Sequence, residues 1–229
     1  MTIVLYELVG KDPARPFSPH CWKAAMSLAH KQLDFDRVPV PFTGVPEVES
    51  SISRTVPVIR DGDRVIADSF DIAVYLDETY PDRPSLFGGP GGQAMARFIE
   101  RWSQGTIHGY LGAAALVDIH DSLAPVDQAY FRESREKRFG RRLEDVPATR
   151  EAGLEAFRAS LAPLRSMLDY QPYIGGTSPL FADYIVFGAF QWVRVVSPFA
   201  LLASDDPVLD WFERCLDLHG GLGRRVEAA

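Results

Sequence analysis

The stretches Ile3-Val4-Leu5-Tyr6-Glu7-Leu8 and Ser18-Pro19-His20-Cys21-Trp22 decide how this chain folds. The first is an apolar run with one charge, which is typical of a strand buried on both faces of a sheet. The second predicts the start of a helix, because serine is a good N-cap and proline suits the first turn. The apolar face of that helix is formed by Trp22, Ala25, Met26 and Ala29. A buried strand that leads into an amphipathic helix predicts an α/β unit.

Further strands and a second helix follow this unit. Phe35–Val40 predicts a second strand, and the prolines near its end place that end at a sheet edge. Val56–Arg60 and Arg64–Ile66 predict a hairpin around Asp61-Gly62, since Asp-Gly tolerates the positive φ of tight turns. Ser69 is predicted to cap the next helix. The order strand, helix, strand, hairpin, helix is that of a small α/β sandwich.

The rest of the chain predicts only helices. Pro84–Gln93 is rich in glycine and proline and indicates a linker, so we expect an α/β domain over residues 1–84 and an all-helical domain over 93–229. Pro163 predicts a kink in one helix, and the polar stretch 127–145 predicts a solvated helix and loop. The apolar stripes of the main helices are Met95, Phe98, Ile99 and Trp102; Leu154, Phe157, Leu161, Leu164 and Leu168; and Val208, Trp211, Phe212 and Cys215.

Composition and charge exclude several classes of protein. The net charge of −7 opposes binding to nucleic acid, because phosphates require a basic surface. Two cysteines exclude a disulfide framework and a cysteine-rich zinc module, and they indicate a reducing compartment such as the cytoplasm. The first residues predict no signal peptide, and no apolar run is long enough to cross a membrane. The five histidines lack metal-ligand spacing, so we expect no metal site.

Four positions in the first half are candidates for chemistry. Ser18 is either an ordinary cap or, with the free N–H groups of its helix, a donor that stabilises a thiolate. Cys21 is either a redox thiol or a small buried side chain. A cis bond at Val56-Pro57 would turn the Val56 backbone outward to pair with an extended peptide. Asp68-Ser69 is either a simple cap or a site for the ammonium and carboxylate groups of an amino acid.

The order of these signals resembles the glutathione transferase superfamily over nearly the whole chain. The resemblance implies an α+β fold, with a thioredoxin-like N-terminal domain followed by an all-α domain, and a homodimer. It also implies glutathione as co-substrate, with Ser18 stabilising the thiolate. Val56 and Pro57 would hold the cysteinyl part, and Asp68 and Ser69 the γ-glutamyl end. The matching segments are Ser18-Pro19-His20-Cys21-Trp22, Thr55-Val56-Pro57-Val58-Ile59, Ala67-Asp68-Ser69 and Phe181-Ala182-Asp183-Tyr184.

Other segments are similar to the bacterial β-aryl etherase branch, whose members cleave aryl ethers of lignin-derived compounds with glutathione, and in part to related fungal transferases. The chain departs from these patterns in two places. Fewer residues follow Arg224 than in the etherases, and Leu180 replaces the usual Ser or Thr, so Ser178-Pro179 is the expected cap there. The similar segments are Pro41-Phe42-Thr43-Gly44, residues 75–84, Ser134-Arg135-Glu136, Arg142-Leu143-Glu144-Asp145-Val146 and residues 216–224.

The resemblance places the pocket for an aromatic electrophile between the domains. Gly105, Gly109 and Gly112 form one smooth helix face, although each glycine costs about 1 kcal/mol in a helix interior. We expect that face to give room to an aromatic substrate or to pack closely against another helix. His108 is expected beside the pocket or on the surface. The candidate pocket residues are Phe17, His20, Phe42, Ile107, Tyr110 and Leu111.

Three alternatives stay open at this point. Tyr6, at the end of the first strand, is a second candidate for stabilising the thiolate, since other classes of the superfamily use a tyrosine there. Within an enzyme, Cys21 would support a redox thiol transferase instead. The third alternative is a protein of the same fold that binds hydrophobic ligands without catalysis. The leading hypothesis is a glutathione-dependent transferase that attacks an aromatic electrophile.

Overall fold

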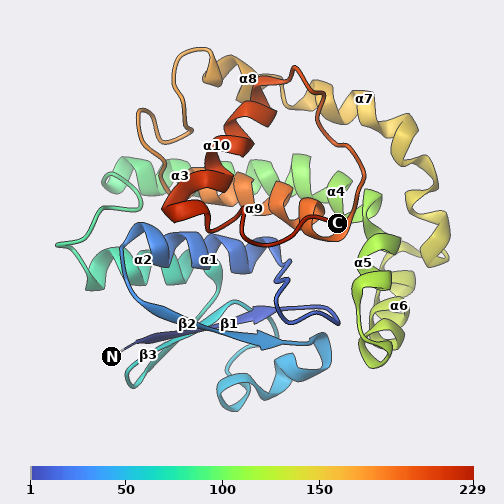
Figure 1. Cartoon of the computed structure of the whole chain (residues 1–229), viewed down its shortest axis with the longest axis horizontal. Helices are drawn as coiled ribbons and strands as arrows, with labels where there is room; N and C mark the ends of the chain where they lie inside the picture. The colour runs from blue at the N-terminus through green and yellow to red at the C-terminus, as the bar shows by residue number, and fades with distance from the viewer. Residues whose placement is uncertain (1) are drawn as a thin grey trace.

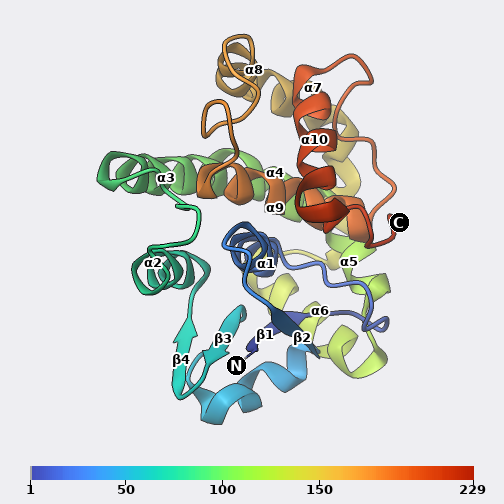
Figure 2. The same cartoon turned by 60° about the vertical axis from the view of Figure 1, so that its left-hand side comes forward.

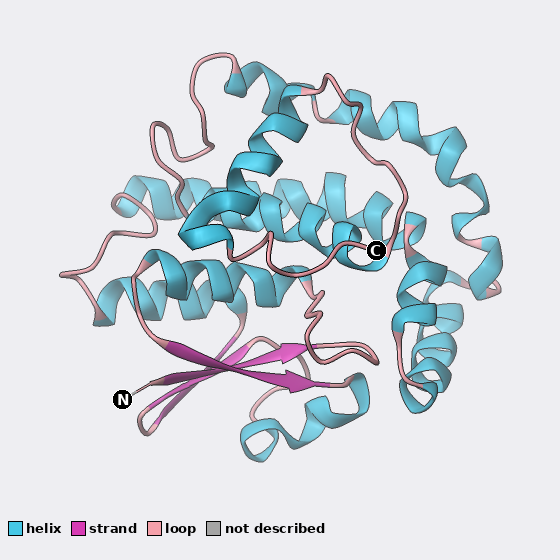
Figure 3. Cartoon of the chain, in the orientation of Figure 1, coloured by secondary structure: helices cyan, strands magenta, loops and turns pink. Residues whose placement is uncertain are grey.

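The N-terminal part of the computed structural model, which describes residues 2–229, is built on a four-stranded mixed sheet with the order β2-β1-β3-β4 (Figures 1 and 3). β1 runs parallel to β2 and antiparallel to β3, and β3 and β4 form the predicted hairpin. The strands are β1 (Ile3–Leu8), β2 (Phe35–Val40), β3 (Val58–Asp61) and β4 (Arg64–Ala67). The first two strands have the predicted bounds, and β2 lies at the predicted edge.

Two helices, α1 (Pro19–His30) and α2 (Ser69–Thr79), cover one face of the sheet, and the 3-10 segment η1 (Phe42–Ser51) lies on the other side (Figure 2). α1 begins directly after Ser18, as predicted. The predicted cap of α2 is wrong by one residue. The Asp68 carboxylate accepts the Phe70 N–H at 2.8 Å, so Asp68 caps the helix and Ser69 is its first residue.

The remainder of the chain is helical, so the predicted fold class is confirmed. α3 begins at Pro90, inside the segment predicted as a linker, because proline suits a first helical turn. The kink predicted from Pro163 is a break at Leu161, between α7 and α8. The elements are α3 (Pro90–Trp102), η2 (Ser103–His108), α4 (Gly109–Ala114), α5 (Leu116–Ser122), α6 (Pro125–Phe139), η3 (Leu143–Asp145), η4 (Pro147–Thr149), α7 (Arg150–Ser160), α8 (Ala162–Leu168), α9 (Phe181–Val196) and α10 (Pro207–Gly221).

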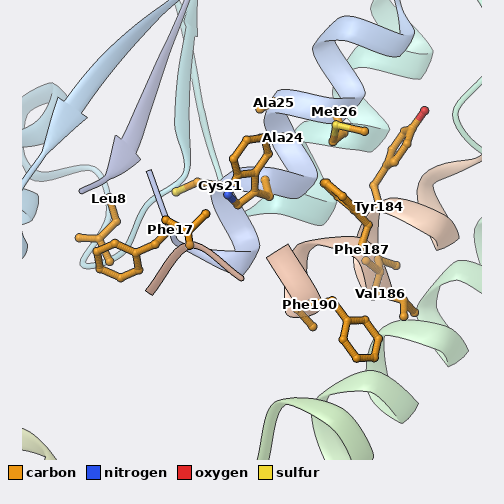
Figure 4. Packing of buried hydrophobic residues seen from close by; sticks show 14 of the residues in the cluster. Leu8, Phe17, Cys21, Ala24, Ala25, Met26, Tyr184, Val186, Phe187 and Phe190 are labelled. Atoms are coloured by element: carbon orange, nitrogen blue, oxygen red, sulfur yellow. The ribbon is translucent and has the colours of Figure 1, made fainter. Parts of the chain in front are cut away.

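Helix α9 packs directly against α1 and joins the two parts of the molecule. Gly188 makes this possible, because a Cβ there would lie 2.3 Å from the Pro19 carbonyl oxygen. The Phe187 ring meets the Trp22 ring edge-on at 6.0 Å between centroids. In Figure 4, Tyr184 and Phe187 of α9 lie against α1. The start of α1 is therefore held from both sides, by the sheet and by α9.

The start of α9 depends on the buried carboxylate of Asp183. It accepts hydrogen bonds from the backbone N–H of Ile174, Gly175 and Leu180 at 2.7 to 2.9 Å. Leu180 is the N-cap, so the expected cap at Ser178 is wrong, and the backbone interactions of Asp183 take over the missing role. Within residues 2–229, the structure contains no helix that is both long and apolar enough to cross a bilayer.

Candidate active site

The first turn of α1 offers hydrogen-bond donors to an anion. The Ser18 hydroxyl oxygen accepts the Cys21 N–H at 3.4 Å, which leaves the hydroxyl proton free to be donated elsewhere. Pro19 has no N–H, and the backbone N–H of His20 has no partner among residues 2–229. The helix dipole also favours negative charge here. Ser18 is therefore placed to hold a thiolate.

Cys21 cannot serve as the reactive thiol in this structure. Its side chain is fully buried, and burial raises its pKa to about 12, with the nearby Glu7 carboxylate adding to the effect. Cys215 is also fully buried, and burial raises its pKa as well. A thiol must ionise and be reached to act as a nucleophile. The geometry disfavours the thiol transferase alternative.

Tyr6 lies on the wrong face of the sheet to assist Ser18. Side chains alternate along a strand, and Glu7 is on the α1 side, where its partner Arg37 stacks on the Trp22 ring. Tyr6 therefore points to the opposite side, where its hydroxyl donates to Glu49. Burial and this hydrogen bond raise the Tyr6 pKa. The structure leaves Ser18 as the candidate thiolate donor.

The Val56–Pro57 peptide bond is cis, in agreement with the motif. Val56 precedes β3, and neither its N–H nor its carbonyl has a backbone partner among residues 2–229. An extended peptide needs such a free N–H and C=O pair to add to a sheet edge. The backbone of Val56 can thus bind a peptide-like ligand.

The start of α2 presents complementary charges to an amino acid. Asp68 has a φ of 73°, and its exposed carboxylate caps the helix through one oxygen only. The Ser69 backbone N–H and hydroxyl have no partner among residues 2–229. A carboxylate fits the Ser69 donors, and an ammonium fits the second oxygen of Asp68.

The candidate pocket residues separate into two groups. Phe17 and Phe42 lie together, with ring centroids 6.2 Å apart. Phe17 is buried, with 3% of its surface exposed, and Phe42 is partly exposed. Ile107 and Leu111 are fully buried in the core and offer no surface to a ligand here. Tyr110 faces away as well, because it stacks on Phe157 of α7 at 4.4 Å and donates to the Arg150 carbonyl at 2.6 Å. Ile107 of η2 and Tyr110 and Leu111 of α4 therefore do not face a ligand at the start of α1.

His20 and His108 meet at that junction. Their rings stack at 5.7 Å between centroids, with 21° between the planes. His108 belongs to η2, a π-helical turn, and such turns are frequent at functional sites. The ring of Trp192 from α9 lies 6.4 Å from His108. Sequence analysis named His20 as a pocket residue and placed His108 either beside the pocket or on the surface. It did not predict their stacking, because that contact depends on how α1 and η2 are placed in space.

The glycine face next to His108 is largely open. A Cβ at Gly105 or Gly109 would meet nothing within 4 Å, so no helix packs on these two residues. A Cβ at Gly112 would lie 3.2 Å from the Trp192 ring, so close packing explains that glycine alone. The expectation of close packing therefore holds at Gly112, while room for an aromatic substrate at Gly105 and Gly109 stays a prediction.

Sequence analysis missed the role of Asp127. This residue lies in the stretch predicted to be solvated, yet it is fully buried. Its two carboxylate oxygens accept the N–H groups of Phe42 and Thr43 at 3.0 and 2.9 Å. Asp127 therefore ties α6 to the segment that carries Phe42. No local signal marks it, because its partners are far away in the sequence.

Comparison with known proteins agrees with this geometry. Family models described as the glutathione S-transferase N-terminal and C-terminal domains match residues 13–84 and 94–217. Glutathione S-transferase Z1 of Arabidopsis thaliana is 41% identical over 69 residues, which span 28% of this chain and 31% of that protein. The glutathione S-transferase-like protein ustS of Aspergillus flavus is 29% identical over 144 residues, 55% of this chain and 49% of that protein. The chain thus spans only about a third to a half of these curated relatives.

Solved structures of fungal enzymes match over nearly the full length. A glutathione S-transferase of Ceriporiopsis subvermispora in complex with glutathione has a TM-score of 0.84 at 25% identity, covering 100% of this chain and 99% of that one. Glutathione transferase GSTFuA3 of Phanerochaete chrysosporium has a TM-score of 0.78 at 26% identity, covering 99% and 94%. The chain therefore belongs to the glutathione S-transferase family, whose co-substrate is glutathione, as the sequence motifs predicted.

Proposed function

We propose that this protein is a glutathione transferase in which Ser18 stabilises the thiolate that attacks an aromatic electrophile. One observation carries the proposal. The Ser18 oxygen accepts the Cys21 N–H, so its own proton is free beside the N–H of His20, which has no partner among the described residues. Two donors at a helix start lower the pKa of a bound thiol. The reactive sulfur comes from glutathione, because both cysteines of the chain are buried.

The N-terminal domain, residues 1–84, binds glutathione in this proposal. The free Val56 backbone pairs with the cysteinyl part beside Pro57. Asp68 takes the γ-glutamyl ammonium, and Ser69 takes its carboxylate. The helical domain, residues 93–229, supplies the far side of the electrophile pocket. The unpaired donors and acceptors at these positions support the assignment, since each matches a group of glutathione.

The proposed electrophile class is the β-aryl ether of lignin-derived compounds. The similarity of residues 142–146 and 216–224 to the bacterial etherase branch supports it. In the reaction the thiolate sulfur forms a bond to the carbon that bears the aryloxy group. The carbon–oxygen bond breaks, and its electron pair leaves with the oxygen as a phenolate. The protein contributes mainly positioning and an ionised thiol.

The test uses glutathione and a fluorogenic β-aryl ether that releases umbelliferone. Ser18→Ala should lower kcat/KM about 100-fold, because a donor to the reacting anion is lost. It should also raise the pKa of bound glutathione, measured by ultraviolet absorbance of the thiolate, with little change in glutathione Kd. Tyr6→Phe is the matched control and should leave both values unchanged. A larger loss in Tyr6→Phe than in Ser18→Ala would contradict the assignment.

We also propose that the protein is a homodimer, with α3 at the interface. Met95 and Phe98 project from α3 with 58% and 62% of their surface exposed, although they belong to an apolar stripe. Sedimentation equilibrium should give twice the chain mass, and Met95→Glu with Phe98→Glu should give a monomer. Val126→Glu is the control, because Val126 is equally exposed on α6. A wild-type monomer would contradict the proposal.

A further inference from the structure

His20 is held across the domain junction, yet its imidazole nitrogens are unused. The residue is two positions after Ser18 and half-buried. Neither ring nitrogen has a hydrogen-bond partner among residues 2–229. Neither nitrogen is among the buried unpaired side-chain atoms of the described residues, so both can be reached from solvent. Its nitrogens are therefore available to a ligand at the start of α1.

The surroundings keep this imidazole neutral. Burial lowers the His20 pKa to about 3, and the nearby Lys23 ammonium and His108 ring act in the same direction. Lys23 is itself fully buried and held by Glu100 at 3.0 Å. Burial also lowers the pKa of His108, to about 4. At neutral pH His20 thus carries one N–H donor and one lone pair, with no charge.

The orientation of His20 is set by His108. His108 Nδ1 lies 3.1 Å from the Ser103 carbonyl oxygen and 3.2 Å from the Ser103 hydroxyl, so it donates to the first in one tautomer and accepts from the second in the other. In both tautomers Ser103 holds the His108 ring across the π-helical turn η2. The stacked His20 ring is held in turn. A donor that is already oriented needs no reorganisation when charge develops on a substrate.

We propose that His20 donates a hydrogen bond from its neutral imidazole to the aryl ether oxygen as that oxygen leaves, and that His108 is the positioning residue for it. The inference rests on the proposed etherase function. The bond from carbon to oxygen breaks as the bond from sulfur to carbon forms, and the electron pair stays on the oxygen. His20 shares the resulting charge without losing its proton. Water protonates the phenolate after release.

The test compares leaving groups of different pKa. Wild type, His20→Phe and His20→Gln are assayed with one ether that releases umbelliferone and one that releases methoxyphenol, a weaker acid. His20→Phe keeps a flat ring but no donor, so kcat should fall about 100-fold for methoxyphenol and about 10-fold for umbelliferone. His20→Gln restores an N–H and should recover part of the methoxyphenol activity. Conjugation of chlorodinitrobenzene should fall less than cleavage of either ether, because chloride is a better leaving group than either phenolate.

The same assays contain the outcomes that overturn the proposal. Equal loss on both ethers and on chlorodinitrobenzene means that His20 only supports the fold. Unchanged ether cleavage in His20→Phe refutes the donor role but leaves the proposed function standing. A wild-type enzyme that conjugates chlorodinitrobenzene and cleaves neither ether refutes the proposed substrate class and the role of His20 with it.

His108→Phe gives an independent readout of positioning. Phenylalanine keeps a stacked ring but loses the bond to Ser103, so the His20 ring is less fixed. We expect kcat on the methoxyphenol ether to fall, with KM and the thiolate absorbance of bound glutathione unchanged. A change in KM alone would contradict a positioning role.

Discussion

The two ends of α1 both contact the helical part of the molecule, but they use their polar groups in opposite ways. At the first end, the Ser18 proton and both ring nitrogens of His20 have no hydrogen-bond partner among residues 2–229. At the other end, His30 donates from Nε2 to the Ser85 carbonyl at 3.1 Å, and its Nδ1 accepts the Tyr184 hydroxyl at 2.7 Å. One helix therefore has an open end suited to ligands and a closed end suited to stability.

The closed end forms a chain of hydrogen bonds whose direction follows from chemistry. The Ser85 carbonyl can only accept, so the His30 proton is on Nε2 and Nδ1 must accept from Tyr184. The Tyr184 hydroxyl has a single proton, so its bond to His219 at 3.0 Å must come from the His219 Nε2–H. Every hydrogen bond is satisfied in one direction. In α1, polar side chains that are fully hydrogen-bonded stabilise the fold, and those without protein partners lie at the candidate site.

The largest expected effect comes from breaking the closed end. Tyr184→Phe removes one hydroxyl and leaves His30 Nδ1 and His219 Nε2 without partners. We expect the free energy of unfolding to fall by about 2 to 3 kcal/mol, measured by urea denaturation. Glutathione turnover per folded molecule should stay within about 2-fold of wild type, since no step of the reaction uses this end.

Two further variants complete this comparison. Tyr170→Phe is the control, because Tyr170 is 89% exposed, and it should leave stability unchanged. Ser18→Ala should show the reverse pattern, with activity lost and stability reduced by only about 1 kcal/mol. Similar activity losses in Ser18→Ala and Tyr184→Phe would contradict the division of α1 into two kinds of end.

A smaller effect is expected from Asp127, which holds Phe42 near Phe17 at the open end. Asp127→Asn turns one acceptor into a donor that faces a backbone N–H, so unfolding free energy should fall by about 1 to 2 kcal/mol. The KM for the aromatic ether should rise more than the KM for glutathione. Asp169→Asn, on the exposed end of α8, is the control for both measurements. Equal rises in both KM values would argue against a role confined to the electrophile side.

The smallest expected effect is the pH dependence of the closed end. Burial lowers the pKa of His219 to about 4 and also lowers that of His30. The unfolded chain binds a proton at His219 below about pH 6.5, while His219 of the folded chain stays neutral down to about pH 4, so stability decreases as pH falls through this range. The lowered pKa of His30 acts in the same direction. His219→Gln keeps an N–H donor but cannot titrate. The difference in Tm between pH 7 and pH 5 should be a few degrees smaller in this variant than in wild type. If the difference in Tm is the same in both proteins, His219 does not contribute to the pH dependence of stability.

Local rules were enough to predict most of the first half of the molecule. The bounds of β1 and β2, the turn at Asp61-Gly62 and the start of α1 after Ser18 agree with expectation, because they depend on apolar periodicity and capping within a few residues. The burial of Asp127 was missed because its partners are distant in the sequence. The cap of α2 was misplaced by one residue for another reason, since Asp68 and Ser69 are both good caps and the Phe70 N–H lies within two residues of Asp68.

The sequence by itself determined the order of the elements, the family motifs and the candidate Ser18, since each depends only on residues that are close together in the sequence. Only the tertiary structure decided which side of the sheet Tyr6 faces, that Cys21 is out of reach, and that His20 lies against His108. Strand alternation tells that Tyr6 and Glu7 oppose each other, but the packing of α1 decides which of them faces the site. The His20–His108 contact joins a residue of the α/β part to a residue of the helical part, far apart in the sequence, so no local pattern encodes it.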